Sequence, residues 1–132
     1  MDTRGVLIGT NLPGEYLLSQ PNEGVVVDIF KSNSDLYITQ FSLSSIFVLG
    51  GRRNIPQKIV ELTIMLLSSS TKKILQIDKR EMIEIYGLRE KWKLGFDDAH
   101  LKFIAEREGL RIATFDKHLL KYPEIAIHPS KL

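Results

Sequence analysis

The chain has 132 residues and a formal net charge of +2, and 43% of its residues are hydrophobic and 26% are charged. This length and balance predict one globular domain, spanning residues 1–132, and they exclude a disordered tail and a membrane-spanning protein. The chain contains no cysteine, which excludes disulfides, thiolate metal sites and cysteine nucleophiles.

Short apolar runs alternate with amphipathic segments from the start of the chain. Residues 5–8 predict a buried strand, which ends at the Gly-Thr-Asn of residues 9–11. Pro13 favours the first turn of a helix. A second helix is predicted to start after residues 21–22 and to end at the turn formers of residues 32–34.

The middle of the chain continues the alternation. Residues 36–39 predict a second strand, and Ser42 is expected to cap the helix that follows. The glycine pair at 50–51 is expected to end that helix. Residues 59–66 predict another helix, and residues 73–77 predict a third strand.

The C-terminal half contains two more helices and two more strands by the same criteria. A helix is predicted over residues 82–92. Residues 96–99 open the next helix, which ends at Gly109, a residue type typical of the position after a helix. Residues 110–114 predict a fourth strand, and residues 125–127 predict a short fifth strand.

This alternation of strands and helices predicts the fold class. It implies right-handed crossovers and a parallel sheet that is covered on both faces. We therefore predict an α/β fold, a three-layer α/β/α sandwich with a central, mostly parallel sheet of four to five strands. The pattern does not predict the order of the strands.

Two aspartates of the C-terminal half are predicted to meet beyond the sheet. In open parallel sheets, sites form at the carboxyl ends of the strands. Asp116 directly follows the strand of residues 110–114, and Asp98 opens the helix that leads into that strand. If the helix packs antiparallel to the strand, Asp98 and Asp116 converge. Mg²⁺ or Mn²⁺ would relieve their repulsion and activate water against a phosphodiester, which predicts nuclease chemistry.

Each of these polar residues also has a structural interpretation. Asp97 fits the N-cap of its helix, Asp98 gains from the helix dipole, and Asp116 fits a cap of the short segment that follows it. His118, two residues after Asp116, is a further candidate for the site. His100 fits a polar position on a helix.

Other function classes lack support. The net charge is too small to indicate nucleic-acid binding by itself. The glycine pair at 50–51 lacks the lysine and serine of a phosphate-binding loop, and no serine-centred elbow is present. Residues 1–4 are not followed by a long apolar stretch, which predicts no signal peptide and, with the absence of cysteine, agrees with a cytoplasmic protein.

Several of these segments resemble the PIN-domain family. Residues 96–117, FDDAHLKFIAEREGLRIATFDK, resemble the closing helix and strand of that family. Asp98 and Ala99 match its "DA" helix start, and residues 114–116 match its "TxD" strand end. The opening VLIGTN is similar to the family's first strand with its Asp-Thr-Asn, and LYITQFSLSS at residues 36–45 is similar to its second strand and next helix. The resemblance covers nearly the whole chain.

The resemblance implies a function and a set of partners. PIN domains are three-layer α/β/α folds, and many are Mg²⁺- or Mn²⁺-dependent ribonucleases, including VapC-type toxins, with three or four acidic residues in the site. It therefore implies an RNA substrate, an antitoxin protein and a homodimer, for which Phe41, Phe47 and Tyr86 are candidate contacts. The implied catalytic metal ligands are Asp98 and Asp116, with Asp97 beside them, and the candidate substrate-binding residues are Thr10, Asn11, Thr114 and His118.

The chain also departs from the family pattern. Gly9 stands where the family has its first aspartate, and Ser45 or a neighbour stands where many members have a glutamate. Asp97 and Glu15 are candidate substitutes. A different register would place Asp2 at the first acidic position, with no strand before it.

Two hypotheses follow from these residues. The first is a PIN-type endoribonuclease, which the aspartates at 98 and 116 favour. The second is a catalytically degenerate PIN domain that binds RNA or protein without cutting, which Gly9 favours. A phosphoacceptor signalling domain would need an acidic pair after the first strand, and residues 9–11 do not supply one.

Overall fold

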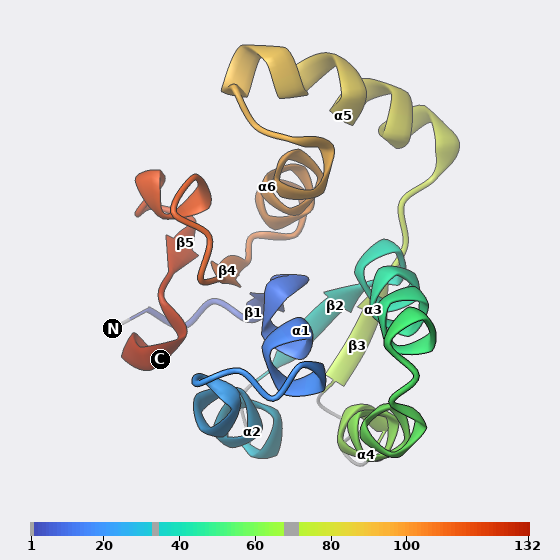
Figure 1. The fold of residues 1–132 in the computed structure, drawn as a ribbon. Helices are drawn as coiled ribbons and strands as arrows, with labels where there is room; N and C mark the ends of the chain where they lie inside the picture. Colours follow the sequence, from blue (N-terminus) through green and yellow to red (C-terminus); the bar gives the residue numbers. More distant parts are fainter. Residues whose placement is uncertain (1, 33–34, 68–71) are drawn as a thin grey trace.

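Five parallel strands form the central sheet, in the order β3-β2-β1-β4-β5 (Figure 1). The computed structural model describes residues 2–32, 35–67 and 72–132. The strands are β1 (Val6–Ile8), β2 (Leu36–Thr39), β3 (Lys72–Leu75), β4 (Arg111–Ala113) and β5 (Ala126–Ile127). Each neighbouring pair is parallel, which confirms the predicted sheet. The first strand of the chain lies at the centre, between β2 and β4.

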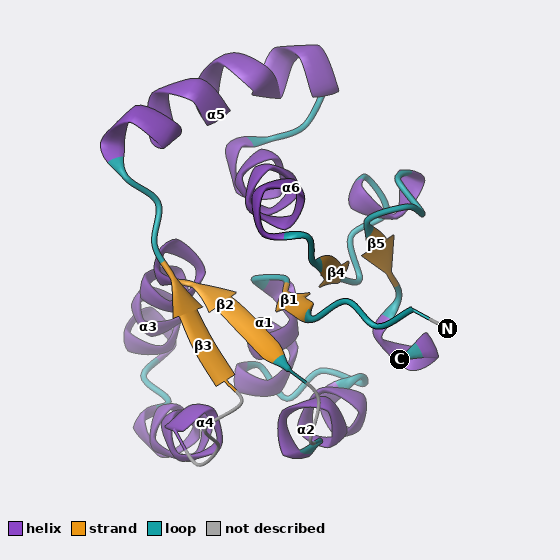
Figure 2. Cartoon of the chain, turned by 180° about the vertical axis from the view of Figure 1, so that it is seen from behind, coloured by secondary structure: helices purple, strands orange, loops and turns teal. Residues whose placement is uncertain are grey.

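Helices cover both faces of this sheet, which confirms the three-layer α/β/α sandwich (Figures 1 and 2). The helices are α1 (Asn11–Leu17), α2 (Glu23–Lys31), α3 (Gln40–Arg53), α4 (Pro56–Leu67), α5 (Lys79–Trp92) and α6 (Phe96–Glu108), and two 3₁₀ turns, η1 (Leu119–Lys121) and η2 (Pro129–Lys131), lie near the C-terminus. Among the described helices, none is both long and apolar enough to cross a membrane.

The core consists of two apolar clusters, one on each face. Successive residues of a strand point to opposite faces. Ile8 accordingly packs in a cluster with α1 to α4, which includes Phe30, whereas Leu7 packs with α5, α6 and the C-terminal segment in a cluster that includes Ile85 and Ile104. Because both faces of β1 are buried, its polar continuation into residues 9–11 is placed firmly at one end of the sheet.

The start of α3 differs from the prediction. The helix begins at Gln40, and the side chain of Thr39 accepts a hydrogen bond from the backbone N–H of Ser42 at 3.0 Å. The N-cap is therefore Thr39, and the prediction that Ser42 caps the helix was wrong. The last residue of β2 is thus also the N-cap of α3, which leaves no loop between the two elements.

The glycine pair at 50–51 does not end α3, contrary to the prediction. The helix runs on to Arg53 and ends at Asn54, whose φ of 51° is left-handed. Gly50 is buried against α4, since a Cβ on it would lie 2.0 Å from Cδ1 of Ile59. The glycine therefore serves the close approach of two helices and not a helix end.

Three further boundaries involve local capping. The third strand stops at Leu75, before the predicted residue 77, and a capping box of Asp78 and Glu81 starts α5 three residues later. The N-cap of α6 is Gly95, so the interpretation of Asp97 as that cap was wrong. Gly109 ends α6 with a φ of 66°, as predicted. Of the predicted turn at residues 32–34, residues 33–34 lie outside the described residues.

Candidate metal centre

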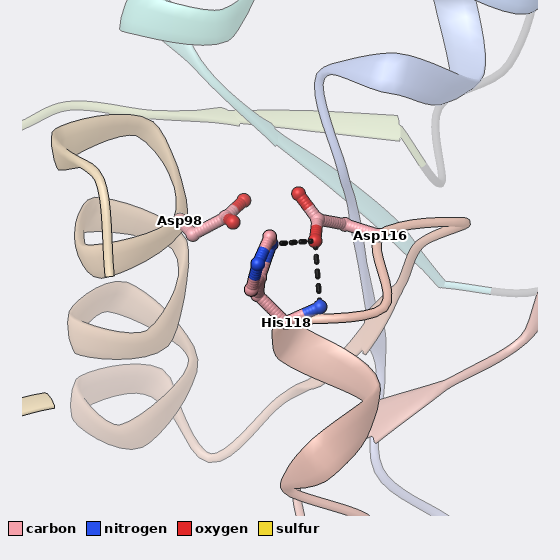
Figure 3. A group of neighbouring side chains, drawn as sticks. All are labelled: Asp98, Asp116 and His118. Carbon is pink, nitrogen blue, oxygen red and sulfur yellow. Dashed lines mark hydrogen bonds and ion pairs between the residues drawn. The ribbon is translucent and has the colours of Figure 1, made fainter. Parts of the chain in front are cut away.

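The carboxylates of Asp98 and Asp116 face each other at the carboxyl end of the sheet (Figure 3). Asp98 lies in the first turn of α6, and Asp116 lies just beyond the end of β4. The chain turns at Gly109 between these two elements, which brings the start of α6 back to the end of β4. One ligand atom each from Asp98, Asp116 and His118 lies within 4.8 Å of the other two. We call these three residues the acidic-histidine group.

The two carboxyl groups have different protonation behaviour. Burial, with the neighbouring Asp116 carboxylate as the next cause, raises the pKa of Asp98 to about 7. Burial alone would also raise the pKa of Asp116, but hydrogen bonds from Asp98 and His118 hold that pKa below its usual value. In the metal-free protein below about pH 7, these pKa shifts favour a proton on Asp98 and the negative charge on Asp116.

The raised pKa of Asp98 gives a testable pH dependence of stability. The unfolded chain releases this proton near the usual pKa of 3.8, and the folded chain releases it near 7. Between these values the folded state binds more protons, so the contribution of Asp98 to the free energy of unfolding falls as the pH rises through this window. We expect the metal-free Asp98→Asn variant to lose this fall and to unfold at a higher temperature than wild type at pH 8.

Thermal unfolding of both proteins in EDTA, from pH 4.5 to pH 8, measures the effect. The matched control is Asp97→Asn, which removes the neighbouring exposed aspartate, the smallest of the causes that raise the pKa of Asp98, and should keep most of the wild-type slope. Parallel curves for wild type and Asp98→Asn would contradict the burial of a proton on Asp98.

Thr114 and Asn11 hold the backbone that carries Asp116. The hydroxyl of Thr114 accepts hydrogen bonds from the backbone N–H of Asp116 at 3.0 Å and from the side-chain amide of Asn11 at 3.4 Å. The Asn11 carbonyl oxygen in turn accepts from the backbone N–H of Phe115 at 3.5 Å. Thr114 is only 1% exposed. Its hydroxyl is thus placed to orient Asp116, and its burial leaves little surface for a substrate.

Asp97 belongs to a different polar network. Its carboxylate accepts a hydrogen bond from the hydroxyl of Thr10 at 3.0 Å, and that hydroxyl also lies 2.7 Å from the hydroxyl of Ser42. The backbone carbonyl of Asp97 accepts from Nδ1 of His100. Nε2 of His100 lies 2.9 Å from the hydroxyl of Thr39. This network ties the start of α6 to the ends of β1 and β2, and Asp97 lies outside the acidic-histidine group.

The interpretation of His100 as a polar helix residue did not predict that its side chain is completely buried. The side chain is 0% exposed and contacts the rings of Phe41 and Phe96, at centroid distances of 4.8 and 6.4 Å. A signal was available, because Phe96, His100 and Ile104 are spaced four apart and share one face of α6. An apolar residue on each side of a histidine at this spacing indicates a buried position.

The positions where the chain departs from the family pattern carry no additional carboxylate. Gly9 lies against β4, and a Cβ on it would be 2.9 Å from the carbonyl oxygen of Ala113. The hydroxyl of Ser45 donates to the carbonyl of Phe41 at 3.0 Å, within its own helix. Glu15 lies outside the acidic-histidine group, and its Oε2 is buried without a hydrogen-bond partner among the described residues.

The alternative register with Asp2 as the first acidic residue is wrong. The carboxylate of Asp2 accepts from the guanidinium of Arg4 at 2.8 Å and lies 3.5 Å from that of Arg111. Arg111 is the first residue of β4, whereas Asp116 follows its last residue. Asp2 therefore lies at the opposite end of the sheet from the acidic-histidine group.

The donor set of the group fits a divalent cation. Mg²⁺ is usually bound through one or two carboxylates, with water in its other positions. Asp98 and Asp116 supply two carboxylates on separate elements, and burial with the Asp116 carboxylate raises the pKa of Asp98, which favours a proton on that carboxyl group. An ion between them would replace this proton and leave positions open for water and a phosphate.

Comparisons with known proteins agree with this fold. The family model of the PIN domain matches residues 6–125. No curated protein sequence matches the chain. Among solved structures, a toxin-antitoxin complex from Klebsiella pneumoniae is similar with a TM-score of 0.70 and 19% identity, covering 95% of this chain and 98% of that one.

Two further solved structures are similar over most of their length. PAE2754 from Pyrobaculum aerophilum has a TM-score of 0.66 and 16% identity, covering 98% of this chain and 86% of that one. The Mycobacterium tuberculosis toxin VapC20, described as cleaving the sarcin-ricin loop, has a TM-score of 0.72 and 12% identity, covering 89% and 94%. At these identities the structural likeness supports the fold.

Proposed function

The chain belongs to the PIN-domain family, and from this premise we propose that it is a divalent-metal-dependent endoribonuclease that hydrolyses RNA phosphodiesters. The observation that carries the proposal is the meeting of Asp98 and Asp116 at the carboxyl end of the sheet, where burial and the neighbouring carboxylate raise the pKa of Asp98. A half-buried carboxyl pair of this kind is a typical feature of functional sites.

The residues of the site would have separate roles in binding the ion and in keeping its ligands in place. Asp98 and Asp116 would hold the ion, and Asp98 would release its proton to solvent as the ion binds. Thr114 and Asn11 would keep the Asp116 backbone in place through the hydrogen bonds described above. Bound Mg²⁺ or Mn²⁺ supplies charge neutralisation at a phosphate and a water of lowered pKa. Thr10, whose hydroxyl contacts Asp97, is a candidate to contact the RNA, and His118 lies beside the two carboxylates.

We further propose that the protein is the toxin of a toxin-antitoxin pair. Two of the similar structures are a toxin-antitoxin complex and a toxin, which supports an antitoxin protein as the partner. A homodimer is also proposed. Of its candidate contacts, Phe47 and Tyr86 are 41% and 60% exposed, whereas Phe41 packs within the chain against Phe96 at a centroid distance of 5.5 Å. The dimer proposal therefore rests on Phe47 and Tyr86.

A second candidate function is a PIN domain that binds RNA without cutting it. The specific observation in its favour is that Gly9 and Ser45 place no carboxylate in the site, so that among the described residues two carboxylates are left to hold the ion. With fewer anionic ligands, the ion binds more weakly and its position is less well defined. The two candidates differ in whether RNA is cleaved, and not in the fold.

Cleavage of a mixed single-stranded RNA pool tests the proposal. We expect wild-type protein to cut the pool in Mn²⁺ and to leave it intact in EDTA, and we expect Asp116→Asn, purified in parallel, to leave it intact in both. Activity that survives in EDTA or in Asp116→Asn would point to a contaminating nuclease. An intact RNA pool that is nevertheless retarded by wild-type protein in a gel would favour the non-cutting candidate.

A further inference from the structure

We propose that His118 is a third metal ligand, which makes this site selective for transition-metal ions over Mg²⁺. The inference rests on the proposed metal site and deepens it, because it assigns to an imidazole the place of a carboxylate that the chain lacks. PIN-like metal sites use acidic residues, whereas a His118 ligand would give this chain a mixed set of two carboxylates and one nitrogen.

The spacing of the acidic-histidine group suits one ion. Ligand atoms about 2.1 Å from a common ion lie about 3 Å apart in adjacent positions and about 4.2 Å apart in opposite ones. Nδ1 of His118 lies 3.1 Å from Oδ1 of Asp116, and one atom from each of the three residues lies within 4.8 Å of the others. Figure 3 shows the imidazole beside the gap between the two carboxylates. A small closing movement would therefore bring all three to bonding distance.

The backbone holds His118 in this place. Its N–H donates a hydrogen bond of 2.7 Å to Oδ1 of Asp116, which turns the chain directly after that aspartate and into η1. The side chain of His118 is 68% exposed, so its ring is not fixed by packing elsewhere. Only one residue, Lys117, thus separates a carboxylate ligand and an imidazole that are oriented toward the same gap.

The metal-free arrangement has a simpler explanation that the experiment must separate from ligation. A carboxylate only accepts hydrogen bonds, so Nδ1 of His118 carries a proton while it contacts Asp116. As a ligand through Nδ1, the neutral imidazole would give up this hydrogen bond and carry its proton on Nε2 instead, a change of tautomer that releases no net proton. If His118 serves only as a hydrogen-bond donor, replacing it should affect all divalent ions alike.

The chemistry of nitrogen ligands predicts which ions benefit. Mg²⁺ prefers oxygen ligands and keeps its water, so an imidazole adds little to its binding. Imidazole suits transition metals, and the affinity of a mixed nitrogen and oxygen site rises from Mn²⁺ to Co²⁺. A site with two carboxylates and His118 should therefore bind Co²⁺ more tightly than Mn²⁺, and Mn²⁺ more tightly than Mg²⁺.

Calorimetric titration of the whole chain with Mg²⁺, Mn²⁺ and Co²⁺ tests the proposal in wild type and in His118→Asn. Asparagine replaces the nitrogen ligand with an oxygen. We expect the affinity of the variant for Mn²⁺ to be at least about tenfold lower than that of wild type, and the loss of affinity for Co²⁺ to be larger. Losses of about this size follow the removal of a group that supports a metal ligand. Mg²⁺ affinity should change by less than about threefold. Pulsed electron paramagnetic resonance of bound Mn²⁺ should show a nitrogen coupling in wild type that is absent from the variant.

Two controls keep the outcomes distinct. His128→Asn makes the same chemical change at a histidine whose Nδ1 lies 2.7 Å from the hydroxyl of Ser130, and it should bind all three ions like wild type. Asp116→Asn should weaken all three ions together. Equal loss for the three ions in His118→Asn, no loss, or no nitrogen coupling in wild type would overturn the ligand assignment while leaving a carboxylate metal site intact. Failure of all three ions to bind wild-type protein would instead overturn the proposed metal-dependent function as well.

Discussion

Replacement of Asp98 by asparagine should lower metal-dependent RNA cleavage by about 100-fold or more. Asparagine keeps the size of the side chain but removes the negative charge that would hold the ion. The loss of a single preorganised electrostatic contact in an active site typically costs 10²- to 10³-fold in rate, that is, about 3–4 kcal/mol. Asp98 lies half-buried opposite Asp116, and the acidic-histidine group contains no third carboxylate that could replace it.

The matched control is the neighbouring residue on the same turn of α6. Asp97→Asn makes an identical change one position earlier, where the carboxylate contacts Thr10 and lies outside the acidic-histidine group. We expect it to change cleavage by no more than a few fold. Initial rates in saturating Mn²⁺ and a titration of Mn²⁺ against rate would separate lost affinity from lost chemistry. Equal rates for wild type and Asp98→Asn would remove Asp98 from the mechanism.

Phe30→Ala should produce the largest loss of stability, about 3–5 kcal/mol in the free energy of unfolding. The ring of Phe30 is 1% exposed and lies in the cluster that packs α1 to α4 on one face of the sheet. Truncation removes its transfer free energy and leaves a cavity that the surrounding helices can fill only in part. Urea unfolding of metal-free protein, followed by circular dichroism, measures the change.

Phe47→Ala controls for the loss of an aromatic ring as such. Phe47 is 41% exposed on α3, so in protein dilute enough to be monomeric, where the proposed dimer contact plays no part, its removal should cost about 1 kcal/mol or less. A similar loss in the two variants would mean that α2 does not pack on the sheet as described. Neither residue belongs to the acidic-histidine group.

The fold was largely predictable because local pattern and tertiary packing agree along most of the chain. The run at residues 5–8 has no polar residue because both faces of β1 are covered, and this made the strand easy to recognise. Strand order was not predictable, since it depends on which crossovers pass over β1. The end of α3 was mispredicted because Gly50 allows the close approach of Ile59 from α4. This contact is between two helices, so it cannot be recognised from the residues next to Gly50 in the sequence.

The site was predictable to the extent that topology brings its residues together. Asp98 and Asp116 were expected to converge because α6 and β4 are joined by a single turn, which brings the start of the helix beside the end of the strand, and their carboxylates do meet. The position of Asp97 was not predictable, because one residue of helical rotation carries its carboxylate to Thr10. The place of His118 depends on the turn after Asp116, in which the aspartate accepts from the histidine N–H. An Asp-x-His spacing directly after a strand is the signal that indicates it.

Gly9 has a consequence for the history of the protein. The carbonyl of Ala113 accepts a hydrogen bond from the N–H of Gly9 at 2.9 Å and would stand equally close to any Cβ at this position. The neighbouring backbone of β4 thus leaves too little room for a larger residue at this position. A lineage that restored an aspartate here would meet a steric penalty before it gained a ligand, so the change is readily made in one direction and resisted in the other. Reversal would require a second substitution that first moves β4 away, and descendants of this chain would more easily recruit a ligand from elsewhere.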